Sequence, residues 1–541
     1  MKEHPAMRTP LAVACAALAL PLALSGCTTP AGTTPATDQL VLATADDLGG
    51  FNPIAGYSAT GVSPLYEGLL RPESDDDQQL PDLVPALAAQ APDVTDDGRT
   101  WTVTLRDDVQ FHDGTDLDST DVAATYEAVI DPESASPIAD DYLLIDRIDT
   151  PDPHTVRFHL RAPNQEFTSR LLLGIAPSEL LTGGPAADSS LNTSPVGTGP
   201  YKLDNLTATE AILVGNPDHR DGQPDVDRLV LRSVLDENAR AQQLLTGEID
   251  GTSLPPRLAD SLDGRDGLEV VAVRSADWRG LSLPVSNPFT ADRAARLALN
   301  TAVDRQSVVD EVLAGHGDVA TTPITDAYPE YVPVQFGSND PAAAMTEAEQ
   351  MLSEAGWEPG PDGIRTRDGE RAELTVAYPV NDGLRRELTS AFADQMRPLG
   401  VEITPWGASW DDIEARAGEV AIMLGGGDNP YTVDTQARRA LHSPTATAGP
   451  FDNPGRLHNQ GIDDALDALD DPANATPPAE LYAQVQTSYQ DDPGYVVLAS
   501  LRHTYVVRDS GHTGPAPILE PHAHGVTWGP WWSLADWQDA G

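Results

Sequence analysis

The sequence predicts an α/β protein built from several domain-sized units. A chain of 541 residues, 40% of them hydrophobic, has enough apolar side chains for sizeable cores. Segments with the two-residue period of a strand alternate along the chain with segments whose apolar residues recur at helical spacing. This alternation is typical of layered α/β folds, and we expect mainly parallel pairing of the strands.

The clearest single unit covers residues 98–131. Residues 101–105 alternate between apolar and polar side chains, as in a half-buried strand. Ser119 or Thr120 is positioned to cap the helix that follows, and Pro132 closes that helix. The pattern therefore predicts one strand, one turn and one helix in succession.

Similar signals continue through the rest of the chain. Further strands are expected at 39–44, 155–160, 226–231, 373–378, 401–404 and 495–507, and further helices at 238–247, 293–315 (as two helices), 348–356 and 388–400. Gly247 is a typical stop for the first of these helices. The aromatic stretch 528–537 ends the chain, and Trp531 and Trp532 within it are expected either in a core or in the wall of a cleft.

The N-terminus has the features of a targeting segment. Lys2 and Arg8 form a basic region, residues 11–24 are an apolar run too short to span a bilayer comfortably, and Leu-Ser-Gly-Cys27 follows at once. This ending resembles a lipobox, in which the cysteine is acylated and becomes the new N-terminus. An ordinary secretory peptide is the alternative. Residues 28–37, rich in Thr, Pro and Ala, predict a flexible tether.

Charge and cysteine content exclude several classes of function. The net charge is -51, and Lys2 and Lys202 are the only lysines, so nucleic-acid binding is not expected. Of the two cysteines, Cys15 lies in the signal and Cys27 is the expected lipidation site, which leaves none for a disulfide or a thiolate metal site. No Gly-x-Ser-x-Gly, Ser-x-x-Lys or His-Glu-x-x-His motif and no EF-hand loop is present, so an enzyme is not expected, and a secreted hydrolase is kept only as a distant alternative.

Several motifs carry a family resemblance. The segment 96–114, DDGRTWTVTLRDDVQFHDG, resembles the signature of the solute-binding protein family 5 of ABC importers, which includes dipeptide-, oligopeptide- and nickel-binding proteins. Two further motifs are similar to the family. The first is Tyr-Glu-Gly-Leu at 66–69, which is expected on a helix. The second is the Gly-Thr-Gly-Pro-Tyr turn at 197–201, where glycines allow positive φ and close backbone approach. Residues 238–251 and the pair Asp304-Arg305 continue the match.

The resemblance implies the type II periplasmic binding protein fold, with two lobes, a hinge and an extra domain in the N-terminal half. The expected divisions are a signal peptide (1–27), a tether (28–37), lobe I (38–60, 193–277 and 503–541), the extra domain of lobe I (61–192) and lobe II (278–502). Hinge closure around a ligand is the expected motion.

The resemblance also implies a ligand site. The segment 419–431 is similar to the place where peptide-binding members put a strand, a tight turn and an aspartate that grips the peptide ammonium, and Asp428 is the matching residue. Asn429, Tyr431 and Trp278 are expected to join it. An aromatic residue common before this turn is replaced here by Gly425-Gly426, and Asp428 as an ordinary loop carboxylate is the alternative.

Peptide capture for a membrane permease is therefore the expected function, with no cofactor. The expected partners are the permease and its ATPase subunits, and the protein is expected to be a monomer held outside the cytoplasm by its lipid anchor. Nickel-chelate binding is the runner-up, in which His442 would contact the metal complex. The pair His522 and His524 is another metal candidate, with exposed loop histidines as the favoured alternative.

Overall fold

The computed structural model describes residues 39–265, 267–328, 334–445, 448–471, 473–522 and 525–539. Cys27, the tether and His524 lie outside these ranges. Within them, no helix combines the length and the apolar character needed to cross a bilayer.

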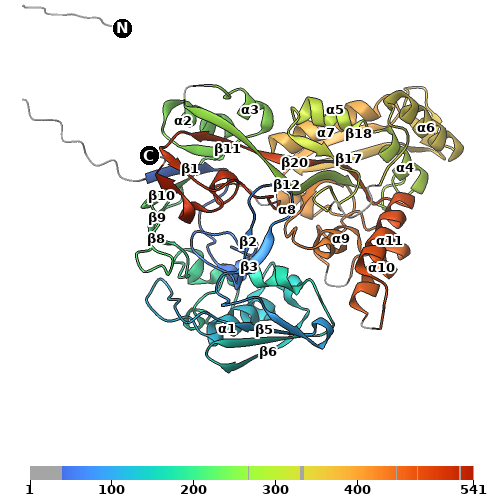
Figure 1. The fold of residues 1–541 in the computed structure, drawn as a ribbon. Helices are drawn as coiled ribbons and strands as arrows, with labels where there is room; N and C mark the ends of the chain where they lie inside the picture. The colour runs from blue at the N-terminus through green and yellow to red at the C-terminus, as the bar shows by residue number, and fades with distance from the viewer. Residues whose placement is uncertain are drawn as a thin grey trace, which may run out of the picture. The chain divides into compact units, whose positions relative to one another are not determined.

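A large mixed sheet of 11 strands organises the described chain (Figure 1). Its order is β18-β17-β19-β12-β20-β11-β1-β10-β9-β8, and β13 pairs with β20 beside this path. The strands are β1 (Gln39–Thr44), β8 (Tyr201–Leu206), β9 (Glu210–Gly215), β10 (Arg228–Ser233), β11 (Gly251–Ser253), β12 (Leu268–Ser282), β13 (Gly317–Val319), β17 (Glu373–Pro379), β18 (Glu402–Ala408), β19 (Ala421–Gly426) and β20 (Tyr495–Arg508).

The expectation of mainly parallel pairing is wrong. Strand β1 is parallel to β10 and β11, and β17 is parallel to β18 and β19, but the remaining described pairings of this sheet are antiparallel. The reason is that β8, β9 and β10 follow one another as a meander, while β12 and β20 run against each other over most of their length. The sequence pattern shows where strands lie but not which distant strand becomes a neighbour.

The long strands β12 and β20 connect two sets of cores. They pair side by side in Figure 1, from Leu268 opposite Arg508 to Ser282 opposite Tyr495. One end of the pair contributes Val273 to a core with β1, β8, β9 and β10, and the other end contributes Leu281 to a core with α4, α6 and α7. The register shifts between Arg274 and Trp278 and again between Arg279 and Gly280. The expected lobe boundaries at 277/278 and 502/503 fall inside these two strands and stay predictions.

Smaller elements complete the fold. The other strands are β4 (Asp93–Thr95), β5 (Thr100–Thr104), β6 (Ile145–Asp152) and β7 (Thr155–Leu160) in one sheet, β2 (Leu70–Glu73) with β3 (Asp82–Pro85), β14 (Glu358–Pro359) with β15 (Arg365–Arg367) and β16 (Glu370–Arg371), and β21 (His512–Thr513) with β22 (Gln538–Asp539). The α-helices are α1 (Ser119–Ile130), α2 (Glu237–Thr246), α3 (Pro256–Asp260), α4 (Arg293–Ala302), α5 (Arg305–Ser307), α6 (Pro341–Glu354), α7 (Gly383–Met396), α8 (Trp410–Glu414), α9 (Val433–Leu441), α10 (Gln460–Asp470) and α11 (Pro478–Asp491).

Most of the expected helices and strands are confirmed within a few residues, and α1 corrects one detail. Its N-cap is Asp118, not Ser119 or Thr120: the Asp118 carboxylate accepts from the Thr120 backbone N–H at 2.6 Å, and Asp121 accepts from the Asp118 backbone N–H at 2.9 Å. This reciprocal box satisfies two helix-end donors, whereas a single hydroxyl satisfies one. The predicted stop of α2 is confirmed, because Gly247 adopts φ 74°.

The segment 64–69 has no regular secondary structure, which contradicts the helix expected there. The backbone N–H groups of Gly199 and Tyr201 donate to the carbonyls of Leu65 and Pro64, so this segment lies along the Gly-Thr-Gly-Pro-Tyr turn. A Cβ on Gly197 or Gly199 would collide with the backbone of this segment. These glycines therefore serve close backbone approach, and neither has the positive φ that the sequence suggested.

A buried polar cluster joins the motifs that carry the resemblance. The Glu67 carboxylate contacts Arg220 Nη2 at 2.6 Å and accepts from Thr198 Oγ1 at 2.9 Å. His112 Nε2 lies 3.0 Å from the Gly199 carbonyl, and its Nδ1 accepts from the Gly197 N–H at 3.3 Å. Burial lowers the pKa of His112 to about 4, so the ring is neutral and matches this arrangement. These contacts connect the turn at 197–201 to Glu67 on one side and to His112 on the other.

Candidate functional site

The carboxyl ends of β17 and β19 form a topological switch point. Strand β17 lies between its parallel neighbours β18 and β19, and α7 and α8 make the connections from β17 to β18 and from β18 to β19. The chain therefore leaves β17 and β19 toward opposite sides, and ligands of open α/β sheets bind at such points. The loop 380–382 with the start of α7, and the turn 427–432 after β19, are located there.

The glycine run 425–427 lets side chains of β12 approach the end of β19. Gly425 and Gly426 lie opposite Arg279 and Trp278 in the register. A Cβ on Gly426 would collide with the Trp278 indole, and one on Gly425 with the Arg279 guanidinium and the His522 ring. Gly427 adopts φ +105°, and a Cβ at this position would collide with the backbone of Ala276. The glycines thus make room for a Trp and an Arg on the neighbouring strand.

The predicted site residues lie around this turn but in different environments. Asp428 is exposed, and its carboxylate lies 3.2 Å from Arg439 Nη1. Asn429 has a buried side-chain oxygen with no hydrogen-bond partner. The Tyr431 hydroxyl donates to the Thr60 carbonyl at 3.1 Å, and so connects this turn to the first part of the chain.

Trp278 is 3% exposed and packs edge-on against Tyr495, with ring centroids 5.6 Å apart. Trp531 is also part of a core, where its ring contacts Tyr505, and Trp532 donates its indole N–H to the Ala516 carbonyl. The structure thus puts Trp531 in the core.

The two histidine candidates have protein partners. His442 ends α9, with Nε2 3.1 Å from Asp467 Oδ1 and Nδ1 2.8 Å from the Ser443 carbonyl. His522 Nδ1 lies 2.9 Å from Asp277 Oδ1. Within the described ranges, no group of three or more His, Cys, Asp and Glu residues is arranged to hold a metal ion.

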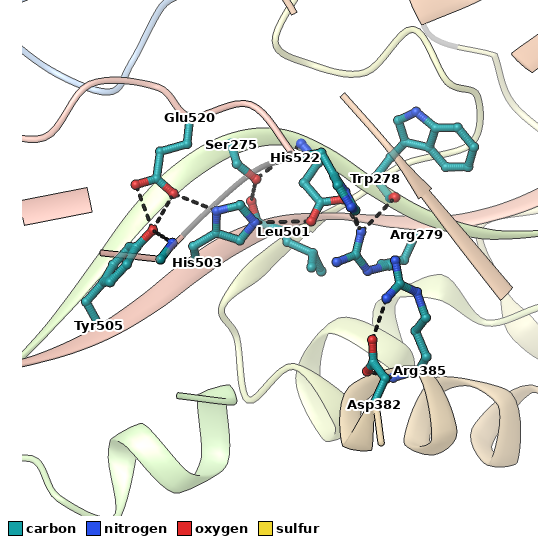
Figure 2. Close-up of polar contacts among 12 residues, drawn as sticks. Ser275, Trp278, Arg279, Asp382, Arg385, Leu501, His503, Tyr505, Glu520 and His522 are labelled. Carbon is teal, nitrogen blue, oxygen red and sulfur yellow. Dashed lines mark hydrogen bonds and ion pairs between the residues drawn. The ribbon is translucent and has the colours of Figure 1, made fainter. Parts of the chain in front are cut away.

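A network of buried charges lies beside the turn (Figure 2). Asp277 is fully buried; its carboxylate pairs with Arg279 and lies 3.1 Å from His503 Nε2. On the other side of the His503 ring, Nδ1 lies 2.5 Å from Glu520, which also accepts from the Tyr505 hydroxyl at 2.9 Å. The residues come from β12, β20 and the segment 518–522, which hydrogen-bonds to β12 through Arg274 and Ala276.

The protonation of this network follows from its geometry. Burial alone would lower the pKa of His503, but its hydrogen bonds to Asp277 and Glu520 raise that pKa to about 9. Burial also opposes ionisation of Asp277, but Arg279, His522 and His503 together hold the pKa of Asp277 well below its ordinary value. His503 is therefore a cation between two carboxylates at neutral pH.

Two arginines stand next to each other at the switch point. Arg385, at the start of α7, contacts the Asp382 carboxylate through Nη1, while Arg279 contacts Asp277 through Nη1. The Nε atoms of both arginines are buried and have no hydrogen-bond partner. The Arg385 guanidinium also lies over the ring of Trp410, 5.7 Å from its centroid.

The carboxylates of Glu166 and of Asp434, in the first turn of α9, lie near each other. Glu166 lies 3.4 Å from the Tyr482 hydroxyl and lines a small cavity with Thr432 and Asp434. Burial first, and then the negative charge of Asp434, raise the pKa of Glu166 to about 7. A larger hollow of about 530 Å³ lies beside α1, but none of the predicted site residues lines it.

The sequence reasoning missed the charged residues of this region. The structure shows that five charged residues form ion pairs here: Asp277, Arg279, Arg385, His503 and Glu520. The sequence offered only a weak signal for two of them: Asp277 and Arg279 stand on both sides of Trp278, in a strand that also contains Glu269 and Arg274. Charged residues are buried almost only when they are paired, and the sequence does not show which of these four are buried.

The mixed α/β sheet, in which β12 and β20 connect two sets of cores, agrees with the two-lobed fold that the sequence resemblance implies. The family model for bacterial extracellular solute-binding proteins, family 5 (middle region), matches residues 82–448. The chain belongs to this family of ABC-importer binding proteins, which confirms the resemblance seen in the sequence motifs.

Individual relatives support the assignment. Protein XP55 of Streptomyces lividans is 36% identical over 508 residues, 92% of this chain and 91% of that protein. The oligopeptide-binding protein AppA of Bacillus subtilis is 28% identical over 327 residues, which span 58% of this chain and 59% of AppA. The structure of NikZ from Campylobacter jejuni in complex with Ni(L-His) superimposes with a TM-score of 0.81 at 26% identity, covering 93% of this chain and all of NikZ.

Proposed function

We propose that this chain captures peptides outside the cytoplasm and delivers them to the permease of an ABC importer, and that it is not an enzyme. The observation that carries the proposal is the pair of opposite charges at the switch point, a carboxylate at Asp428 and guanidinium groups at Arg279 and Arg385. A free peptide carries an ammonium at one end and a carboxylate at the other. The similarity to the oligopeptide-binding protein AppA supports the same class of ligand.

In this proposal, Asp428 binds the peptide ammonium, and Asn429, Tyr431 and Trp278 shape the turn around it. The buried Asn429 oxygen without a hydrogen-bond partner suits an ammonium donor. Arg439, now 3.2 Å from Asp428, would be displaced or would share the carboxylate with the ligand. Capture proceeds by closure of the two lobes, favoured by the contacts that only the ligand-bound form makes.

The replacement Asp428→Asn is expected to weaken peptide binding by about tenfold to a hundredfold, or about 1.4–2.7 kcal/mol. The loss stays moderate because Asp428 is 60% exposed in its side chain, where water screens the charge. Calorimetric titration of free and N-acetylated peptides measures the effect, with Asp464→Asn, an exposed residue of α10, as the control. Equal affinity of the wild type for free and N-acetylated peptides would assign Asp428 to the ordinary loop carboxylates.

Lipid anchoring through Cys27 is part of the same proposal, since two or three acyl chains hold a protein firmly on a membrane. The replacement Cys27→Ser is expected to move the protein from the membrane fraction into the medium, with an unchanged circular dichroism spectrum. Retention of this variant in a fraction that needs detergent for release would contradict the lipoprotein assignment.

Binding of a nickel chelate is the second candidate function. It is favoured by the similarity to NikZ, whose structure contains Ni(L-His). His442, the residue expected to contact such a complex, would have to leave Asp467 and the Ser443 carbonyl in order to do so. The peptide proposal ranks first because three of the side chains that it uses, Asn429, Arg279 and Arg385, each have a buried polar atom without a hydrogen-bond partner.

A further inference from the structure

Two hydrophobic cores of the chain meet along a seam at the start of α9. One of them, here called the α1 core, takes its buried residues from positions 54–186, and the other, the α9 core, takes them from positions 276–519. Tyr431, just before α9, packs against the α1 core, and its hydroxyl donates to the carbonyl of Thr60, 371 positions away. Because each core has its own buried cluster, the seam can open without unfolding either of them.

Glu166 makes a second contact across this seam. It lies just before the 3-10 helix Phe167–Leu172 of the α1 core, and its half-buried carboxylate is 3.4 Å from the Tyr482 hydroxyl of α11. The Thr432 side chain and the Asp434 backbone also hydrogen-bond to it. Thr432 is the N-cap residue of α9, but its own side chain makes no capping hydrogen bond. Glu166 therefore supplies, from the α1 core, an acceptor for the first turn of α9.

The basic side chains near this contact are engaged elsewhere. Arg438 pairs with Asp434, and its Nε lies 3.0 Å from the Asp434 carboxylate. Arg170 is the one basic residue among the described residues that line the small cavity beside Glu166. Its Nε donates to the Asp141 carbonyl at 2.8 Å, away from Glu166. When Glu166 is ionised, it therefore faces the Asp434 carboxylate without a basic partner of its own.

Protonation of Glu166 changes this contact from repulsive to neutral. The ionised form repels Asp434, and Arg438 does not compensate for both charges because it is also 3.1 Å from Asp470 of α10. The protonated form is an O–H donor that no longer repels Asp434. Burial, followed by the charge of Asp434, raises the pKa of Glu166 to about 7.

An open seam returns the Glu166 carboxyl to water, where its ordinary pKa is 4.5. Since the pKa is higher in the closed seam, the closed form binds more protons than the open form. Protons therefore favour closure. The stabilisation that they give the closed seam is full below the ordinary pKa and is lost as the pH rises through 7.

We propose that Glu166 and the start of α9 form a proton-operated latch between the α1 core and the α9 core, which is closed in acid and loosened in alkaline solution. The latch goes beyond the proposed function, because it acts on the protein's own conformation and does not depend on which ligand is captured. The turn 427–432, which carries Asp428, leads directly into α9. Ligand capture that requires a closed seam should therefore be tighter in acid.

Hydrogen–deuterium exchange of the ligand-free full chain, read by mass spectrometry, tests the latch. The wild type and Glu166→Gln are compared at the same pH, so that the intrinsic chemistry of exchange cancels. The amides of residues 431–436 are expected to exchange faster in the wild type, because the neutral glutamine side chain resembles the protonated acid. The ratio of the two exchange rates should grow by about tenfold or more between about pH 5 and about pH 8.

Three comparisons separate opening of the seam from other effects. Glu133→Gln, at an exposed position near α1, should exchange like the wild type at both pH values. The amides of β7 (155–160), inside the α1 core, should exchange equally in the wild type and Glu166→Gln. Tyr431→Phe loses the hydrogen bond to Thr60, so it should exchange faster than the wild type at both pH values and keep the pH dependence.

The exchange ratio decides the outcome. A ratio that stays the same between the two pH values would overturn the latch. An equal change in the amides of β7 would also overturn it, because Glu166 would then act on the stability of the whole chain. If calcium chloride slows exchange of the wild type at about pH 8 and acid does not, the two carboxylates bind a metal ion and not a proton. Each of these results would leave peptide capture intact.

Discussion

The replacement Asp277→Asn is expected to lower the free energy of unfolding by about 3–5 kcal/mol. Asp277 is the fully buried carboxylate that Arg279 and His503 share, and both of these cations are buried as well. The amide keeps the shape of the side chain but removes its charge, so two buried cations lose a counter-ion. Urea denaturation followed by tryptophan fluorescence measures the change.

The pH dependence of this effect distinguishes a lost charge from a packing defect. His503 has a pKa raised to about 9, so its contribution to stability is full below the ordinary histidine pKa near 6.5 and is lost as the pH rises through 9. Asp277→Asn should flatten this decline, because His503 then has one carboxylate partner instead of two. The matched control is Asp263→Asn, an exposed position expected to change stability by less than about 0.5 kcal/mol. A variant as stable as that control would contradict the assigned role.

The replacement Glu67→Gln is expected to destabilise the protein by about 3 kcal/mol. Glu67 and Arg220 are 14% and 9% exposed in their side chains and 2.6 Å apart. Loss of the carboxylate leaves Arg220 buried with only Asp221, an exposed residue, as an ionic partner. Because the cluster joins the turn at 197–201 to the segment 64–69, we expect the whole unfolding transition to move to a lower urea concentration.

Acidification gives an independent check on Glu67. Burial alone would raise its pKa, but the neighbouring His219 and Arg220 lower it to about 2. Its stabilising contribution is therefore present above the ordinary glutamate pKa near 4.5 and is lost as the pH falls through 2. Glu73→Gln is the control, since Glu73 also pairs with an arginine at 2.7 Å but at the surface, where such a pair contributes less than about 1 kcal/mol. Equal losses in the two variants would rule out burial as the source of the stabilisation.

The sequence predicted the local structure well because local patterns determine it. The strand at 155–160 is confirmed residue for residue as β7, and Gly247 ends α2 by adopting the left-handed conformation. The failures had non-local causes. The segment 64–69 is not helical: the carbonyls of Pro64, Leu65 and Glu67 accept hydrogen bonds from residues more than a hundred positions away, and helix propensity contains no information on such partners.

The candidate site was only partly accessible to sequence reasoning. The turn after β19 was identified through its resemblance to peptide-binding relatives, and the structure puts it at a switch point of the sheet. The roles of the individual residues Asp428, Asn429, Tyr431 and Trp278 stay predictions. Arg279 and Arg385 were missed because their significance depends on a meeting of β12 with the start of α7, which are a hundred residues apart in the chain.

Calorimetric titration of the wild-type protein with di- to pentapeptides, and separately with nickel plus histidine, tests the central claim most directly. Saturable heat from one or more of the peptides, with a Kd of about 10 μM or tighter, and no saturation by the nickel complex, is the result that a peptide-capturing protein should give. Saturation by nickel plus histidine, with no peptide binding at any length, would contradict the claim and identify the chain as a metal-chelate binder.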